Sequence, residues 1–268
     1  MRIAEVKVTP IAFRDPPLLN AAGIHEPYAL RSIIEVHTEC GRTGLGESYG
    51  DAAALSAFQA VAPALAGLDP FDLNGLTRLC AEAIAALPPP APGAELAPGS
   101  DPARQLANCV SAFEVALLDL QAQHAGLPLH ALLGGAVRRE VPFSAYLFFK
   151  YARHIEPEEA PDEWGEAVTP EQIVAQARRM IELYGFGSIK LKAGTLPPDL
   201  EVASIEALAR AFPGLPLRID PNGAWSMETA IRCAERLGPL IEYYEDPVDG
   251  LEAMGELHRR TGLPLATN

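Results

Sequence analysis

The N-terminal half of the chain shows two patterns of hydrophobic residues, first the two-residue alternation of strands and then the spacing of helices. The segment IAEVKVTPIAF alternates apolar and polar residues, and SIIEVHTECGRTGLGES predicts two strands joined by a turn near Cys40 and Gly41. Apolar residues then recur at helical spacing in DAAALSAFQAVAPALAGL and in ANCVSAFEVALLDLQAQHAG. The Pro-rich stretch between them predicts a long surface loop. Strands followed by helices predict an α+β domain, which we place at residues 1–135.

Strands and helices alternate after Gly135. The strand EVPFSAYLFF leads through an acidic loop to a helix start at Thr169-Pro170-Glu171-Gln172. Four more strands end at Lys192, Asp220, Glu245 and Asn268, spaced 28, 25 and 23 residues apart. This spacing is typical of parallel βα units. A closed barrel needs eight such strands and about 250 residues. We therefore predict an incomplete (β/α) barrel over residues 136–268, ending after about its fifth strand.

Composition and charge restrict the classes of function. A net charge of −14 argues against a nucleic-acid partner, because phosphate binding needs clustered cations. No apolar run is long enough to span a membrane, and the N-terminus lacks the apolar core of a signal peptide. The four cysteines show no CxxC spacing, which argues against a disulfide framework or a zinc site. We expect a cytoplasmic protein.

Polar side chains end the later strands of the predicted barrel. The carboxyl ends of parallel barrel strands meet at one face, so we expect these side chains to share a site. Asp220, Glu245 and Asn268 offer only oxygen ligands, which favour Mg²⁺ over zinc. The alternative is three separate helix N-caps, although glutamate is a poor N-cap.

Lys190 and Lys192 are two residues apart, so on a strand they face the same way. Two like charges beside a divalent cation predict lowered pKa values, which would suit one lysine as a general base and leave the other to bind an anion. The alternative is a basic edge strand exposed to water. A metal and a base at one site predict abstraction of a proton next to a carboxylate, and a lysine or histidine base with Mg²⁺ is typical of the enolase superfamily.

The motifs KLKAG, RIDPNGAWS, YYEDP and LPLATN, in that order, resemble the mandelate-racemase branch of the enolase superfamily, most specifically the glucarate dehydratases. TGLGES and FEVALLDLQAQHAGLPLHALLGG, further upstream, are similar too. The resemblance implies an N-terminal capping domain over a modified (β/α)₇β barrel that binds Mg²⁺. The ATN ending is the most discriminating motif, because many members of the superfamily carry an acid at that third ligand.

The resemblance also implies roles for individual residues. Lys192 matches a catalytic base, and Lys190 matches a second catalytic lysine that contacts the substrate carboxylate. Asp220 and Asn268 match metal ligands. Taken alone, His25 is typical of a surface loop and Tyr146 of a core. The implied substrate contacts are His25, Tyr146, Lys190, Asp220, Asn222 and Asn268.

This chain departs from the glucarate dehydratases in two places. The segment between EDP and ATN is shorter, and in some relatives a later glutamate is the metal ligand; we choose Glu245, with Glu252 as the alternative. The family's catalytic histidine and its aspartate partner have no counterpart, because the chain ends first, so we expect a C-terminally truncated chain. We assign no catalytic role to the remaining histidines, which are His37, His124, His130, His154 and His258.

Together these observations predict Mg²⁺-dependent dehydration of a glucarate-type acid sugar, in the catabolism of such acids. A base removes the proton α to a carboxylate, and hydroxide leaves from the β carbon. The alternatives are a racemase, epimerase or cycloisomerase on the same scaffold, or an inactive fragment without the histidine–aspartate pair. We expect a small-molecule substrate, no nucleic-acid or membrane partner, and a homo-oligomer at full length.

Overall fold

The computed structural model describes residues 1–88, 104–156 and 158–267. The predicted Pro-rich loop, Leu87 to Ala103, lies almost entirely outside the described residues. The chain divides into two compact units. One comprises Met1–Phe13 and Ala29–Arg139, and the other comprises Arg14–Tyr28 and Glu140–Asn268.

The first unit contains a three-stranded sheet, in the order β1-β4-β5, and helices. β4 and β5 pair antiparallel, from Arg31 opposite Tyr49 to His37 opposite Thr43, so the turn predicted near Cys40 is confirmed. Helix α2 was not predicted. The elements of this unit are β1 (Ile3–Arg14), β4 (Tyr28–Thr38), β5 (Thr43–Tyr49), α1 (Ala52–Val61), the 3₁₀ turn η1 (Ala62–Leu65), α2 (Leu73–Ala85), α3 (Gln105–Ala125) and α4 (Leu129–Leu132).

Two glycines of the TGLGES motif let helix α3 lie directly against strand β5. A Cβ atom on Gly44 would come within 2.1 Å of the Ala116 carbonyl oxygen, and one on Gly46 within 2.4 Å of the Ala112 carbonyl oxygen. Larger residues would therefore force the helix off the sheet. The core of the unit lies beneath this contact and includes the fully buried Ile34.

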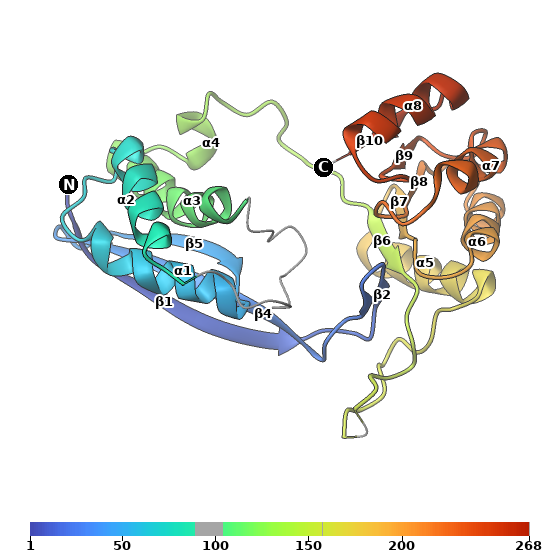
Figure 1. The fold of residues 1–268 in the computed structure, drawn as a ribbon, viewed down its shortest axis with the longest axis horizontal. Coiled ribbons are helices and arrows are strands. Elements are labelled where there is room, and N and C mark those ends of the chain that lie inside the picture. Colours follow the sequence, from blue (N-terminus) through green and yellow to red (C-terminus); the bar gives the residue numbers. More distant parts are fainter. Residues whose placement is uncertain (89–103, 157, 268) are drawn as a thin grey trace. The chain divides into compact units, whose positions relative to one another are not determined.

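The second unit contains a five-stranded sheet in the order β10-β9-β8-β7-β6, in which every neighbouring pair is parallel. Helices α5 to α8 follow one another along this sheet (Figure 1). This succession is that of a partial (β/α) barrel and confirms the predicted fold class. The elements are β6 (Ala145–Phe148), α5 (Pro170–Tyr184), β7 (Ile189–Lys192), α6 (Pro198–Ala211), β8 (Leu217–Asp220), α7 (Met227–Leu237), β9 (Tyr243–Glu245), α8 (Leu251–Thr261) and β10 (Leu265–Ala266).

Alternation along these short strands separates an apolar face from a polar one. In β7, Ile189 and Leu191 are fully buried, whereas Lys190 and Lys192 lie on the opposite face. The same alternation puts Leu217 and Ile219 of β8 in the core of the unit. The pattern of the sequence therefore decides which side chains line the polar face.

The start of α5 confirms the signal read from the sequence. The Thr169 hydroxyl accepts the N–H of Gln172, and the Gln172 side chain accepts the N–H of Thr169. This reciprocal capping box satisfies amide groups that the first turn of a helix leaves free. Within the described residues, every helix is too short or too polar to cross a membrane.

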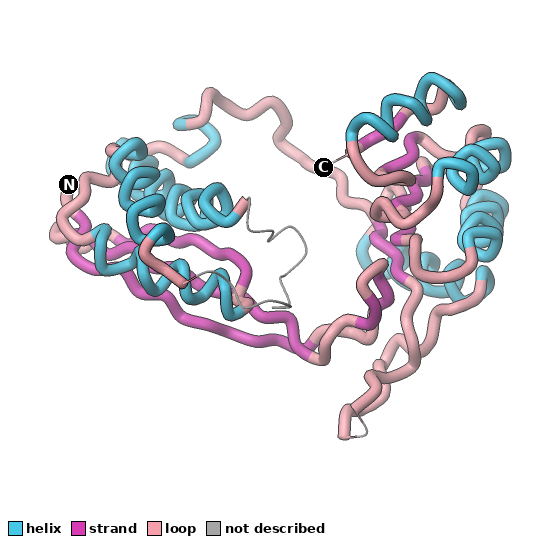
Figure 2. Tube along the Cα trace, in the orientation of Figure 1, coloured by secondary structure: helices cyan, strands magenta, loops and turns pink. Residues whose placement is uncertain are grey.

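The segment Arg14–Tyr28 belongs to the second unit although it is distant from it in sequence. It contains a small antiparallel pair, β2 (Leu19–Asn20) with β3 (Gly23–Ile24). The N–H of Leu19 donates to the Phe149 carbonyl at 2.8 Å, directly beyond β6. Figure 2 shows the two short strands of this segment beside the chain that leaves β6. The segment carries His25 to the end of the parallel sheet.

Gly194, directly after β7, provides a test of this packing. Its φ is +79°, and an added Cβ atom would lie 2.2 Å from the Pro221 carbonyl oxygen. We expect Gly194→Ala to lower the free energy of unfolding by at least about 1–2 kcal/mol, because both the backbone conformation and the contact become strained. Gly187→Ala, before β7 and in open space, is the matched control and should be nearly neutral. Equal effects in urea unfolding would contradict this account.

Candidate functional site

The polar face of the parallel sheet gathers charged side chains from three adjacent strands. β7 supplies Lys190 and Lys192, β8 supplies Asp220, and β9 supplies Glu245. Lys192 and Asp220 are direct neighbours in the register of β7 and β8. Because these strands are parallel and adjacent, their carboxyl ends lie together, and all four side chains meet at that end of the sheet.

Asp220 is the most buried member of this group, with a residue exposure of 1%. Its Oδ2 atom lies 3.0 Å from Lys190 Nζ and 2.8 Å from Lys192 Nζ. Its Oδ1 atom accepts the backbone N–H of Asn222 at 3.0 Å. A carboxylate removed from water needs such partners to remain charged. Asp220 therefore brings the Nζ atoms of Lys190 and Lys192 together at one of its oxygens.

Lys190 is held between two carboxylates, since its Nζ also lies 2.5 Å from Glu245 Oε1. Burial opposes its charge, but the hydrogen bond with Glu245 and the charge of Asp220 outweigh burial and raise the pKa of Lys190 above its ordinary value. Lys190 therefore remains an ammonium ion at neutral pH. This direction of the pKa shift holds without a bound cation, so the lowered pKa expected for a lysine beside a divalent cation stays a prediction.

Lys192 points to the same carboxylate from the last position of β7. Its Nζ lies 2.7 Å from Asn222 Oδ1, so the predicted base and the predicted substrate contact are in direct contact. The side chains of Lys190 and Lys192 are only 17% and 12% exposed, and β7 lies between β6 and β8. The alternative of a basic edge strand exposed to water is therefore wrong.

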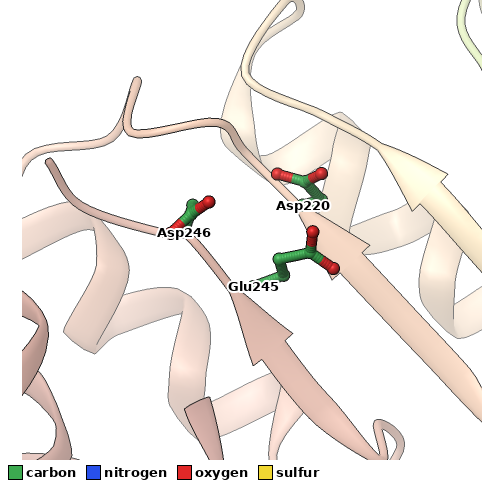
Figure 3. Close-up of side chains that lie close together, drawn as sticks. All are labelled: Asp220, Glu245 and Asp246. Atoms are coloured by element: carbon green, nitrogen blue, oxygen red, sulfur yellow. The ribbon is translucent and has the colours of Figure 1, made fainter. Parts of the chain in front are cut away.

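Three carboxylates converge at the ends of β8 and β9 (Figure 3). One oxygen each of Asp220, Glu245 and Asp246 lies within 4.8 Å of the others. This donor set of oxygens alone fits Mg²⁺, which prefers carboxylate ligands. Sequence reasoning missed Asp246, although the EDP motif puts a second acid directly after the strand. Glu252 lies on α8, outside this group, and Asn268 lies outside the described residues.

The alternative interpretation of the strand ends as helix N-caps is also wrong for Asp220 and Glu245. The helix after β8 is capped by Ser226, whose hydroxyl accepts the N–H of Thr229. The helix after β9 has Gly250 at its N-cap position. Both acids are therefore free of a capping role, and their oxygens face the shared site.

Two predicted substrate contacts lie in a row beside the lysines. Tyr146 neighbours Lys190 in the register of β6 and β7, and its ring centroid lies 4.9 Å from Lys190 Nζ. Partial burial raises the pKa of the Tyr146 phenol to about 12, with Lys190 opposing this rise. Phe148 packs on Tyr146, with 4.7 Å between ring centroids, and His25 packs edge-to-face on Phe148 at 5.9 Å.

A buried carboxylate that sequence reasoning missed shapes the loop after Lys192. Glu201, in the first turn of α6, is fully buried. One of its oxygens accepts the N–H groups of Thr195 and Leu196, both at 2.9 Å, and the other accepts that of Gly194 at 3.0 Å. These bonds fix the backbone that immediately follows the predicted base.

Family profiles match both parts of the chain. Residues 4–134 match the N-terminal domain of the mandelate racemase / muconate lactonizing enzyme family. Residues 172–268 match the enolase C-terminal domain-like profile of the same family. Together the two matches include most of the chain.

Individual proteins of this kind are similar to the chain, two of them over its whole length. A probable glucarate dehydratase from Streptomyces coelicolor is 49% identical, and the match covers all of this chain and 63% of the relative. An enolase from Pseudomonas fluorescens, solved with bound magnesium, potassium and tartrate, is 66% identical with a TM-score of 0.95, over all of this chain and 63% of that one. A D-Ala-D/L-Ala epimerase from Cytophaga hutchinsonii is 37% identical over 53% of this chain and 34% of its own length. The chain thus spans less than two thirds of the length of these relatives.

Glu201 offers a direct test of how the loop after β7 is held. Glu201→Gln replaces one accepting oxygen by an amide group that cannot accept a hydrogen bond. We expect the free energy of unfolding to fall by about 1–3 kcal/mol, as for a buried donor that loses a charged partner. Glu235→Gln, at an exposed position of α7, should change it by less than about 0.5 kcal/mol. Indistinguishable urea midpoints for the two variants would exclude this role.

Proposed function

The chain belongs to the mandelate racemase / muconate lactonizing enzyme branch of the enolase superfamily, and on that premise we propose that its site serves Mg²⁺-dependent dehydration of a glucarate-type acid sugar. The observation that carries this proposal is the contact of two lysines and two carboxylates at the ends of β7, β8 and β9. The similar Streptomyces protein, a probable glucarate dehydratase, supports the reaction. The Pseudomonas structure, which holds magnesium with a hydroxylated diacid, supports the class of substrate.

The two lysines take different roles in this proposal. Lys190, whose side chain lies between the Asp220 and Glu245 carboxylates, is suited to bind a substrate carboxylate. Lys192 accepts the proton from the carbon next to that carboxylate, and its Nζ is held in place by Asp220 and Asn222. The electron pair left on that carbon forms the new double bond as the C–O bond at the β carbon breaks and hydroxide leaves. The proton taken up by Lys192 is then returned to solvent, so that the balance is the loss of one water.

Asp220 and Glu245 are the proposed metal ligands, with Asn268 as the third. Mg²⁺ bound there supplies positive charge that stabilises the substrate carboxylate as negative charge builds up during proton removal. Glu245 contacts Lys190, so it has to share or release this lysine in order to bind a cation. The released Lys190 side chain can then contact the substrate carboxylate. Asp246 lies close enough to contribute an oxygen or to hold a water.

Proton abstraction at this site would also serve an epimerase or racemase. The similarity to a D-Ala-D/L-Ala epimerase favours that second candidate, because the same first step then ends in reprotonation. The two candidates differ in their products. Dehydration yields a keto-deoxy acid, whereas epimerisation only replaces the α proton.

Metal binding tests the proposed ligand set. We expect Mg²⁺ to raise the midpoint of thermal unfolding of the chain, because a ligand that binds only the folded state stabilises it. Glu245→Gln should abolish most of this rise, and Glu252→Gln on the exposed start of α8 should retain it. The opposite order of the two variants, measured by calorimetry, would assign the second ligand to Glu252.

Isotope exchange tests the proposed base. The chain, incubated in D₂O with Mg²⁺ and glucarate, should incorporate deuterium at an α carbon and form a keto-deoxy acid. Lys192→Ala should slow exchange by at least about 100-fold, the usual loss on removing a general base. Lys7→Ala, an exposed lysine on β1, is the control and should exchange like the wild type. Exchange unchanged in Lys192→Ala would remove Lys192 from the mechanism, and exchange without dehydration would favour the epimerase.

A further inference from the structure

The segment Arg14–Tyr28 contains a second acid–base pair, outside the group of lysines and carboxylates. His25 Nδ1 lies 2.8 Å from Asp15 Oδ2, and both side chains are about a quarter exposed. A carboxylate can only accept a hydrogen bond, so the Nδ1 atom carries the proton of this contact. Within the described residues, His25 Nε2 makes no hydrogen bond.

The backbone holds both members of the pair in place. The N–H of Asp15 donates to the Pro27 carbonyl at 3.0 Å, and the N–H of His25 donates to the Leu18 carbonyl at 2.8 Å. The Asp15 carbonyl accepts a hydrogen bond from Nε2 of His154 at 2.8 Å, and His154 is almost fully buried. Three separate hydrogen bonds therefore fix the backbone of the pair, unlike that of an isolated ion pair on a protein surface.

The imidazole of His25 is also fixed relative to the lysine strand. Its ring packs edge-to-face on Phe148, and Phe148 neighbours Lys192 in the register of β6 and β7. The next side chain on this face, Tyr146, neighbours Lys190. The Nε2 atom of His25 therefore lies at the same end of the sheet as the two lysines.

We propose that Asp15 is a positioning residue that selects the Nδ1-protonated tautomer of His25 and leaves Nε2 as an acceptor for a substrate hydroxyl. The proposal rests on the proposed function for the identity of the substrate, an acid sugar whose hydroxyl groups supply the donor. A carboxylate at Nδ1 fixes both the tautomer and the ring orientation, as it does for histidines that act through their other nitrogen. Without Asp15, the proton is free to move to Nε2 and block the acceptor.

Nitrogen NMR of the chain labelled with ¹⁵N-histidine tests this directly and needs no turnover. At alkaline pH, where an imidazole is neutral, we expect wild-type His25 to carry its proton on Nδ1, with the signal assigned from the spectrum of His25→Gln. In Asp15→Ala the proton should move partly or wholly to Nε2. Asp249→Ala, which removes an exposed carboxylate of the same unit, should leave the spectrum unchanged. A wild-type proton on Nε2, or a tautomer unaffected by Asp15→Ala, would overturn the proposal.

A double-mutant cycle on turnover then tests the consequence for the substrate. Asp15→Ala should lower kcat/KM about tenfold, chiefly through KM, the effect of losing one well-placed hydrogen bond. In the His25→Gln background the same substitution should have no further effect, because Asp15 acts through His25. Additive losses would overturn the proposal. Absence of wild-type turnover would count against the proposed function alone, since the tautomer is measured independently.

Discussion

The contact of one buried carboxylate, Asp220, with two lysine side chains organises the polar end of the parallel sheet. Asp220 accepts hydrogen bonds from both lysines of β7, and Glu245 accepts a further one from Lys190, so two carboxylates and two lysine side chains share one largely desolvated site. Ions removed from water are stable only when their partners are close and well oriented. Pairing with these carboxylates allows two lysines on a strand in the interior of the sheet and keeps Lys190 charged. Lys192 also contacts the side chain of Asn222.

The surrounding fold serves to keep these side chains in register. Apolar residues of β7 and β8 fill the core beneath the helices, which forces the alternate, polar residues to the opposite face. The loop after β7 is fixed twice, by the glycine that fits against the Pro221 carbonyl and by the three amide groups that Glu201 accepts. Segment Arg14–Tyr28 adds the Asp15–His25 pair to the same end of the sheet. Elements far apart in sequence therefore supply one chemical surface.

Much of this arrangement follows from the periodicity of the sequence. The spacing of Lys192, Asp220 and Glu245 predicted successive parallel strands, and the two-residue period predicted that both lysines share a face. Helix α2 was missed because Asn74 and Gly75 are weak helix formers, and its stability comes from burial of Leu76 and Cys80. The charge state of Lys190, and the contact of Asp15 with His25, depend on pairs that only the folded chain brings together. No local pattern carries them.

Crystals grown with Mn²⁺ in place of Mg²⁺, together with a hydroxylated diacid, would locate metal and substrate relative to Asp220 and Lys192. We expect an anomalous scattering peak between the Asp220 and Glu245 carboxylates, with Lys190 moved from Glu245 to a substrate carboxylate and Lys192 facing the adjacent carbon. Such a result would show that metal, substrate and the proposed base, Lys192, all lie next to the Asp220 carboxylate. A peak at Glu252, or a substrate bound away from Lys192, would contradict this expectation.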